Sequence, residues 1–384
     1  MNQAVNQVRP GHEAPAIPLT MKPKFRAKPP RHFAEMTGAE RAAIVENLGH
    51  KSFRVKQLAT HYFARHTADP ADWTDIPAAS RSGLVTELFP ELLTVCRELR
   101  ADKGTTLKTL WGLHDGLRIE SVLMRYPKRT TLCVSSQVGC GMACPFCATG
   151  QMGFTRNLSA AEMLEQVRLA MLTLDRGDLP GGPTRLNNLV FMGMGEGLIN
   201  YSALMTCIRT LITEVPNGFG MSARNLTVST VGLVPGIKRL AAEGLPLTLA
   251  LSLHAPDDDL RNELVPINTK FSVDEALDAA RAYFDATGRR ISIEYALIKD
   301  MNDHAWRADL LAKKLNARGR GWVHMNPIPL NPTPGSIWTA STREVSAEFV
   351  ARLRFAHIPT TVRDTRGSDI DGACGQLAAD EEEK

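Results

Sequence analysis

From residue 126 onward, short apolar runs alternate with longer stretches whose apolar residues recur at helical spacing. Six runs have strand length and are apolar almost throughout: 130–136, 187–192, 225–231, 247–253, 291–297 and 322–328. Helix-like stretches lie between them, at 159–174, 202–214, 234–243, 273–286 and 304–318. Strands that are buried on both faces and joined by helices run parallel. Because six units are fewer than a complete eight-fold barrel needs, we predict an α/β fold with an incomplete (β/α)6 barrel over residues 126–367.

Four other segments surround this core. Residues 1–35 hold six basic and two acidic residues among many prolines, which predicts a flexible basic arm. Residues 36–97 contain three helix patterns, the first opened by a T-x-x-E capping box at Thr37 and Glu40, and predict a small helical accessory domain. We expect a short β linker region over 98–125. Residues 368–384 form a C-terminal loop and an acidic tail.

The composition excludes several classes of protein. With 43% hydrophobic and 22% charged residues, the chain is typical of a globular protein rather than a disordered one. No apolar run approaches the roughly 20 residues of a membrane span, and no secretory signal is recognisable, so we expect a cytoplasmic protein. We take it to be a monomer. The seven cysteines of such a chain indicate metal binding or catalysis rather than a disulfide scaffold.

Three cysteines follow the first barrel strand in the sequence GCGMACPFC, which spaces Cys140, Cys144 and Cys147 as C-x3-C-x2-C. Three thiolates on so short a loop can converge on one metal centre. A closed zinc site takes four ligands, and no fourth one is near in sequence. A [4Fe–4S] cluster held by three thiolates leaves one iron open for another ligand. The spacing resembles that of the radical S-adenosylmethionine (SAM) superfamily, whose open iron binds the amino and carboxylate groups of SAM.

Polar groups and glycines follow the later strands. The carboxyl ends of parallel barrel strands are where active sites are built, so these residues are candidates for binding SAM. Glu196 could accept a hydrogen bond from the SAM ammonium, and a glycine turn around it allows the backbone to approach a ligand closely. The candidate SAM-binding residues are Gly195, Glu196, Ser229, Ser252, Leu253, His254 and Asn331.

Two more cysteines stand out. Cys133 lies seven residues before the first cysteine of the loop, and Cys374 lies near the C-terminus in RGSDIDGACGQL. Glycines at 372 and 375 flank Cys374 and indicate a flexible loop rather than a core position.

Five segments in this order resemble the RlmN-type RNA adenine-C2 methyltransferases over about residues 36–378. They are TLCVSSQVGC with its two following cysteines, FMGMGE, SLHAPDD, PLNPTPG and TRGSDIDGACGQL. One departure is visible, because Gly197 stands where the family pattern has proline. Loss of that rigid residue is expected to loosen the loop without removing a ligand.

The resemblance implies a mechanism with two SAM molecules. Cys374 takes a methyl group from the first and becomes S-methylcysteine, and a radical generated from the second activates that methyl for addition to adenine C2. Glu120, thirteen residues before Cys133, would accept the C2 proton. Cys133 would then release the RNA by forming a transient disulfide with Cys374.

The resemblance also implies the partners. The substrates would be an adenosine of 23S rRNA near the peptidyl-transferase centre and the adenosine 3′ to the anticodon in tRNA, and a flavodoxin-like protein would donate electrons. Because phosphate contacts come from basic residues, the arm and the helical domain are candidate RNA-binding elements. Four arginines are further candidates: Arg343, Arg352, Arg354 and Arg363.

Three alternatives remain open at this point. The Cfr-type enzymes, which methylate C8, share the same cysteine set. A radical SAM enzyme acting on a small molecule or a protein would explain the three-cysteine loop but not Cys133 or Cys374. A zinc-containing RNA-binding protein without catalysis would bind no SAM.

Overall fold

The computed structural model describes residues 28–333 and 336–378. Most of the predicted basic arm, residues 1–27, therefore lies outside the described residues. The end of that predicted arm is ordered: residues Phe33–Glu35 form a single 3-10 turn. Phe33 is fully buried, and the Arg41 guanidinium lies 4.3 Å from the centre of its ring. Burial of a large aromatic ring is stabilising. Since Phe33 is buried against Arg41 of the helical domain, residues 33–35 belong to that domain and not to a free arm.

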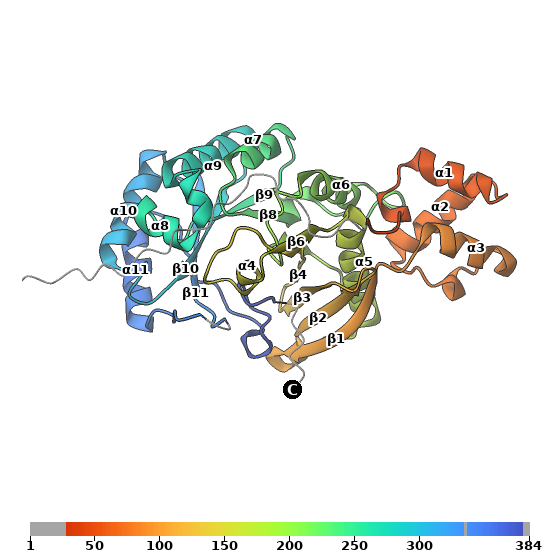
Figure 1. Ribbon diagram of the computed structural model, residues 1–384, viewed down its shortest axis with the longest axis horizontal. Coiled ribbons are helices and arrows are strands. Elements are labelled where there is room, and N and C mark those ends of the chain that lie inside the picture. Colours follow the sequence, from red (N-terminus) through yellow and green to blue (C-terminus); the bar gives the residue numbers. More distant parts are fainter. Residues whose placement is uncertain (1–27, 334–335, 379–384) are drawn as a thin grey trace, which may run out of the picture.

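The helical domain forms the right-hand end of the molecule (Figure 1). It contains α1 (Gly38–Asn47), α2 (Phe53–Ala59) with a π-helical turn at Thr60–Ala64, and α3 (Ala78–Leu88). The predicted capping box is present, with Thr37 and Glu40 exchanging side-chain and backbone hydrogen bonds. Tyr62 and Phe63 are fully buried, so these aromatic side chains are core residues and not surfaces for stacking RNA bases.

The domain docks on the barrel through helix α5 (Ala160–Arg176). The Tyr62 hydroxyl donates to the Glu165 carboxylate at 2.5 Å, and Arg168 pairs with the same carboxylate at 2.7 Å. Buried charges are stable only when paired and hydrogen-bonded in this way. The barrel and the helical domain therefore share one polar core at their junction.

The predicted boundary at residue 97 needs correction, whereas β strands are present in the region 98–125 as predicted. Helix α3 ends at Leu88, since Phe89 precedes Pro90 and adopts an extended φ of −129°. Three antiparallel strands follow and extend the barrel sheet from one edge. They are β1 (Leu93–Ala101), β2 (Thr106–Leu113) and β3 (Arg118–Tyr126). Leu92 and Leu93 are buried, but Leu93 is the first residue of β1 and neither belongs to α3.

The six predicted barrel strands are confirmed. They pair in parallel in the order β4-β7-β8-β9-β10-β11, in one sheet of nine strands that stays open. Their bounds are β4 (Arg129–Cys133), β7 (Asn188–Phe191), β8 (Leu226–Thr230), β9 (Thr248–Ser252), β10 (Ile291–Leu297) and β11 (Val323–Pro329). The incomplete (β/α)6 barrel is therefore the observed architecture.

Helices cover the outside of this sheet, while the loops after the strands meet in front of it (Figure 1). The larger helices besides α5 are α6 (Tyr201–Ile212), α7 (Val234–Ala242), α9 (Val273–Thr287), α10 (Ala305–Ala317) and α11 (Arg343–Phe355). Short elements lie among the loops: β5 (Gln137–Gly139), α4 (Ala148–Met152), β6 (Phe154–Asn157) and α8 (Asp258–Leu264). In the described ranges, no helix is both long and apolar enough to span a membrane.

Candidate active site

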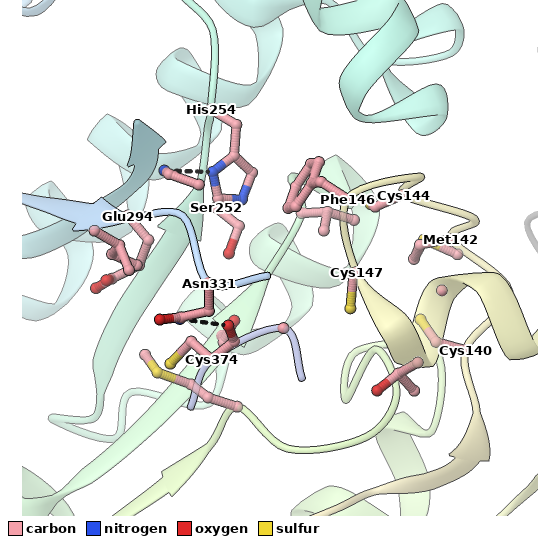
Figure 2. A pocket seen from close by; sticks show the side chains of 18 of the residues that line it. Cys140, Met142, Cys144, Phe146, Cys147, Ser252, His254, Glu294, Asn331 and Cys374 are labelled. Carbon is pink, nitrogen blue, oxygen red and sulfur yellow. Dashed lines mark hydrogen bonds between the residues drawn. The ribbon is translucent and has the colours of Figure 1, made fainter. Parts of the chain in front are cut away.

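The three-cysteine loop runs from the end of β5 to the start of α4. The backbone N–H of Cys140 donates to the Gly153 carbonyl at 2.9 Å, and that of Cys147 donates to the Cys144 carbonyl at 3.1 Å. Glycine is required at position 150, because a Cβ there would lie 2.7 Å from the Cys144 carbonyl oxygen. The loop is thus closed by contacts within its own segment, and Cys140 and Cys147 point into the same space (Figure 2).

Burial raises the pKa of all three thiols of this loop. Thiols in such a place carry no charge unless a cation compensates for the lost hydration, and iron or zinc supplies that compensation. No group of three His, Cys, Asp or Glu side chains in residues 28–333 and 336–378 converges closely enough to hold a single metal ion. A [4Fe–4S] cluster binds each cysteine at a different iron atom. Three thiols that line one chamber are the donor set that such a cluster requires.

The chamber in front of these thiols, called chamber A, lies at the carboxyl ends of the barrel strands. Its empty space, including solvent at the open mouth, is about 980 Å³. Six of the seven candidate SAM-binding residues line it together with the three cysteines: Gly195, Glu196, Ser229, Ser252, His254 and Asn331. Their positions at the ends of β7, β8, β9 and β11 explain how residues 136 positions apart in sequence meet.

Glu196 is a buried carboxylate at the wall of chamber A. Its oxygens accept the backbone N–H groups of Val231 at 2.9 Å and Leu198 at 3.3 Å. Burial nevertheless raises the pKa of Glu196 to about 7. A cationic ligand group beside it would favour the ionised form again, because an opposite charge lowers the pKa of a carboxyl group.

His254 is held as a neutral imidazole. Its Nδ1 accepts the Ala296 N–H at 3.0 Å, and its ring meets Phe146 edge-on with 4.9 Å between the ring centres (Figure 2). Burial, and then the neighbouring Arg261 guanidinium, lower the pKa of His254 to about 3. Since Nδ1 is occupied as an acceptor, Nε2 carries the proton and can donate to a ligand in the chamber.

Leu253 does not line chamber A, unlike its two neighbours in sequence. Its side chain is fully buried, its N–H donates to the Glu294 carbonyl, and its own carbonyl accepts from Arg261. The Leu253 side chain therefore forms no part of the chamber wall, and a SAM contact by this residue stays a prediction. It supports the chamber by holding the strand ends together.

The glycine loop after β7 depends on two different glycines. Gly195 has φ +100°, and a Cβ there would lie 2.5 Å from that of Gln137, so only glycine fits. Gly197, which replaces the family's proline, has no such restriction, and its nearest neighbour for a Cβ is Leu204 at 3.4 Å. The loop therefore takes its shape from Gly195 and the Glu196 hydrogen bonds rather than from residue 197.

Cys374 reaches chamber A on the C-terminal loop. Asn331 Nδ2 donates to the Cys374 carbonyl at 3.0 Å (Figure 2). Ala148 N–H donates to the Gly375 carbonyl at 2.8 Å. Thr149 adds a hydrogen bond to the Leu377 carbonyl at 2.5 Å. The C-terminal loop is thus fastened to the first turn of α4, directly behind the three-cysteine loop.

A second chamber, called chamber B, adjoins chamber A and is lined by both Cys133 and Cys374. The two chambers share Met192, Asn331 and Cys374 in their walls. All seven cysteines lie in the described ranges and are free thiols, so no disulfide between Cys133 and Cys374 is formed in this structure. Burial, and then the neighbouring Cys374 thiol, raise the pKa of Cys133 to about 12. The fold therefore brings together two cysteines 241 residues apart in sequence.

Glu120 lies on β3 and is buried. One carboxylate oxygen pairs with the Lys108 ammonium at 2.8 Å, and the other accepts the backbone N–H of Ala378 at 3.1 Å. It lines neither chamber. In this arrangement Glu120 anchors the C-terminal loop, and its role as a proton acceptor stays a prediction.

Sequence reasoning did not place two charged residues, Arg363 and Glu294, in the walls of the chambers. Arg363, which the sequence suggested as a phosphate contact, lines both chambers. Its guanidinium lies 3.3 Å from the carboxylate of Glu294 in the middle of β10. Charge interaction with Cys374 is the first cause that raises the pKa of Arg363. The one available signal was Glu294 itself, since a carboxylate inside the apolar strand ISIEYAL needs a buried partner.

The comparisons with known proteins point to one group. Residues 134–311 match the family model of the radical SAM superfamily. A protein of Kineococcus radiotolerans is 64% identical over 368 residues, covering 95% of this chain and 94% of its own length. A protein of Kocuria rhizophila is 61% identical over 365 residues, covering 94% and 96%. Both are named "probable dual-specificity RNA methyltransferase RlmN".

A solved structure is also similar along nearly the whole chain. It is the crystal structure of a radical SAM methyltransferase from Sphaerobacter thermophilus, with a TM-score of 0.86 and 44% sequence identity. The alignment covers 91% of this chain and 100% of that one.

Proposed function

The chain belongs to the RlmN family of dual-specificity, SAM-dependent RNA methyltransferases, and on that basis we propose that it methylates C2 of an adenosine in 23S rRNA and of the adenosine 3′ to the anticodon in tRNA. The observation that carries the proposal is the meeting of Cys133 and Cys374 in one chamber, beside a second chamber lined by three further cysteines. A radical SAM enzyme of ordinary type needs only the second of these features.

Cys140, Cys144 and Cys147 would hold a [4Fe–4S] cluster, and Glu196, Ser229, Ser252, His254 and Asn331 would bind SAM beside it. When bound, the cluster supplies the electron that turns a second SAM into a radical able to remove hydrogen from an unreactive methyl group. The neutral His254 offers a donor and Glu196 an acceptor, which suits the carboxylate and ammonium groups of SAM. An external protein, for which a flavodoxin-like carrier is the family expectation, would deliver the electron.

Cys374 would act as a nucleophile and as a carrier. Its thiolate attacks the methyl carbon of the first SAM, the methyl–sulfonium bond breaks, and S-adenosylhomocysteine leaves as a neutral thioether. Adenine C2 is electron-poor and does not attack a methyl sulfonium, which is why the carbon must be delivered as a protein-bound species. The position of Cys374 in the walls of both chambers lets it receive the methyl in one and deliver it in the other.

Glu120 and Cys133 would complete the cycle. Glu120 would accept the C2 proton after the Ala378 N–H has left its carboxylate. The adduct would also give up its unpaired electron to an external carrier. The Cys133 thiolate would then attack the Cys374 sulfur, the sulfur–carbon bond to the RNA would break, and a disulfide would form. The released carbon would take up a proton and become the methyl group on C2. Two electrons from an external reductant must reopen that disulfide before the next turnover.

The first experiment is mass spectrometry of the tryptic peptide Gly367–Lys384 from anaerobically purified protein. This peptide contains one cysteine, Cys374. An added methyl group on Cys374 is the expected result. An unmodified thiol in protein that contains a full iron–sulfur cluster would contradict the roles of Cys374, Cys133 and Glu120 together.

A second measurement addresses the position of the methyl group. RNA from cells with and without the enzyme is digested to nucleosides and separated by mass spectrometry. We expect 2-methyladenosine in both rRNA and tRNA. Finding only 8-methyladenosine would assign the chain to the Cfr-type activity instead.

A further inference from the structure

The turn between β3 and β4 concentrates positive charge around one aromatic ring. Residues 125–129 read Arg-Tyr-Pro-Lys-Arg and contain no acidic residue. The Arg129 guanidinium lies 4.5 Å from the centre of the Tyr126 ring, and the Arg366 guanidinium, from the C-terminal loop region, lies 5.0 Å from it. Two guanidinium groups against one ring are a charged, flat surface of the kind that binds single-stranded nucleic acid.

This group, called the Tyr126 cluster (Tyr126, Arg129 and Arg366), stands at chamber B. Tyr126 and Arg366 line the chamber together with Cys133 and Cys374, whereas Glu196, Ser252 and His254 line only chamber A. Cys374 therefore lines the chamber of the candidate SAM site as well as the chamber that Tyr126 and Arg366 line. A methyl group carried by Cys374 would border both chambers.

The cations of the cluster are not equally neutralised. Arg366 donates to Asp364 at 3.2 Å and lies 3.8 Å from Asp102, so these carboxylates partly neutralise its charge. Arg129 is exposed, and the contact described for it is the one with the Tyr126 ring. Lys128 beside it is also exposed. The rim of chamber B thus keeps positive charge available to an anion.

We propose that the Tyr126 cluster holds the sugar-phosphate backbone of the RNA substrate at the rim of chamber B. The inference rests on the proposed function, which already requires the unstacked target base at Cys133 and Cys374, and it adds the residues that position the RNA. A base inside a helix or loop stack cannot reach a buried sulfur, so it has to leave the stack. Guanidinium groups that are fixed against a ring can then contact the flanking phosphates and stack on the displaced base.

The test uses the iron-loaded, full-length enzyme and an RNA hairpin of the anticodon-loop type. The hairpin carries fluorescent 2-aminopurine in place of the adenosine 3′ to the anticodon, and its affinity and fluorescence are measured across a salt series. The variants are Tyr126→Leu, Tyr126→Phe and Arg129→Gln. Matched controls are Phe284→Leu and Arg281→Gln, an arginine–aromatic pair on the outer helix α9 with 5.2 Å between guanidinium and ring centre.

We expect Tyr126→Leu to weaken RNA binding by about tenfold, because base stacking and cation–π contacts are lost. The altered fluorescence of the displaced base should disappear with it, whereas Tyr126→Phe should retain both. Arg129→Gln should lower the slope of log affinity against log salt by about one, as loss of one phosphate contact does. The two α9 controls should bind as the unchanged enzyme does.

The outcomes separate this inference from the proposed function. If the unchanged enzyme binds and methylates RNA while Tyr126→Leu and Arg129→Gln bind as well as it does, the nucleotide site is elsewhere and the inference is wrong. If the unchanged enzyme carries no methyl group on Cys374 and does not bind RNA, the proposed function itself fails. Arg129 is exposed and makes no core contact, so its variant tests the site even where Tyr126→Leu disturbs folding.

Discussion

The two cysteine-bearing loops of the site are held in opposite ways. The three-cysteine loop is closed by hydrogen bonds within a span of 14 residues, from Cys140 to Gly153. The C-terminal loop with Cys374 is fastened to residues far away in sequence, 228 positions for Thr149–Leu377 and 258 for Glu120–Ala378. The first loop is a local motif that a short sequence specifies. The second has a place only when the whole barrel has formed, and loops held by few bonds open most easily.

The largest effect should come from breaking the local motif. Cys144→Ala removes one of three thiolates from the three-cysteine loop, so the cluster and all methylation activity should be lost. Iron analysis, the visible spectrum and an RNA methylation assay measure this. The exposed Cys96 on β1 provides the control, since Cys96→Ser should keep both iron and activity. Full turnover by Cys144→Ala would contradict the cluster assignment.

The second-largest effect is expected at Cys133 and Cys374, which only the tertiary structure brings together. Cys133→Ala should stop turnover after the RNA has been joined to Cys374, because no thiolate is left to displace it. A protein–RNA band that survives denaturing electrophoresis is expected. The double variant Cys133→Ala, Cys374→Ala should lose that band. If the Cys133→Ala enzyme turns over and forms no adduct, Cys133 is not the residue that releases the RNA.

A smaller effect is expected at Arg363, which connects the two chambers. The pKa of Cys133 is raised by burial and by Cys374, and Arg363 opposes this rise. Arg363→Gln should therefore raise that pKa further and leave less thiolate at neutral pH. Release of RNA should slow by roughly tenfold to a hundredfold, and the rate should recover as the pH is raised. Arg363→Lys should lie between the two, and an unchanged pH profile in Arg363→Gln would exclude an electrostatic role.

The smallest effect should be seen when the C-terminal loop is loosened without touching the three-cysteine loop. Lys108 pairs with Glu120, and its ammonium also donates to the Asp371 carbonyl at 3.3 Å. Lys108→Met leaves a buried carboxylate unpaired and should lower the free energy of unfolding by about 3 kcal/mol. Thermal unfolding measures this, and hydrogen exchange should show faster opening of residues 371–378.

The control for that experiment is Lys313→Met on α10, where the lysine is exposed and little change is expected. Iron content should stay the same in both variants. Loss of iron in Lys108→Met would show that the two loops are coupled more tightly than their hydrogen bonds indicate.

Much of the fold could be predicted because it rests on periodic patterns. The six barrel strands and the helices between them follow from apolar runs and helical spacing, and the capping box at Thr37 fixes the start of α1. The strand β1 was missed at its start, because Leu84, Leu88 and Leu92 continue a helical spacing across Pro90. Pairing with the antiparallel strand β2 shows that residues from Leu93 onward form a strand and not the end of a helix. Such pairing joins separate segments and is not a local property of the sequence.

By itself the sequence determined the donor set of the three-cysteine loop and the polar residues at the strand ends, since both depend on short spacings and on a common edge of a parallel sheet. The tertiary structure alone decided the rest. Cys133 and Cys374 line one chamber, and Arg363 lies in the walls of both chambers instead of on the surface. The Leu253 side chain does not line chamber A. Glu120 pairs with Lys108 and accepts a hydrogen bond from Ala378. The physical reason is that burial and charge pairing depend on which distant segments pack together, and a linear pattern does not contain that information.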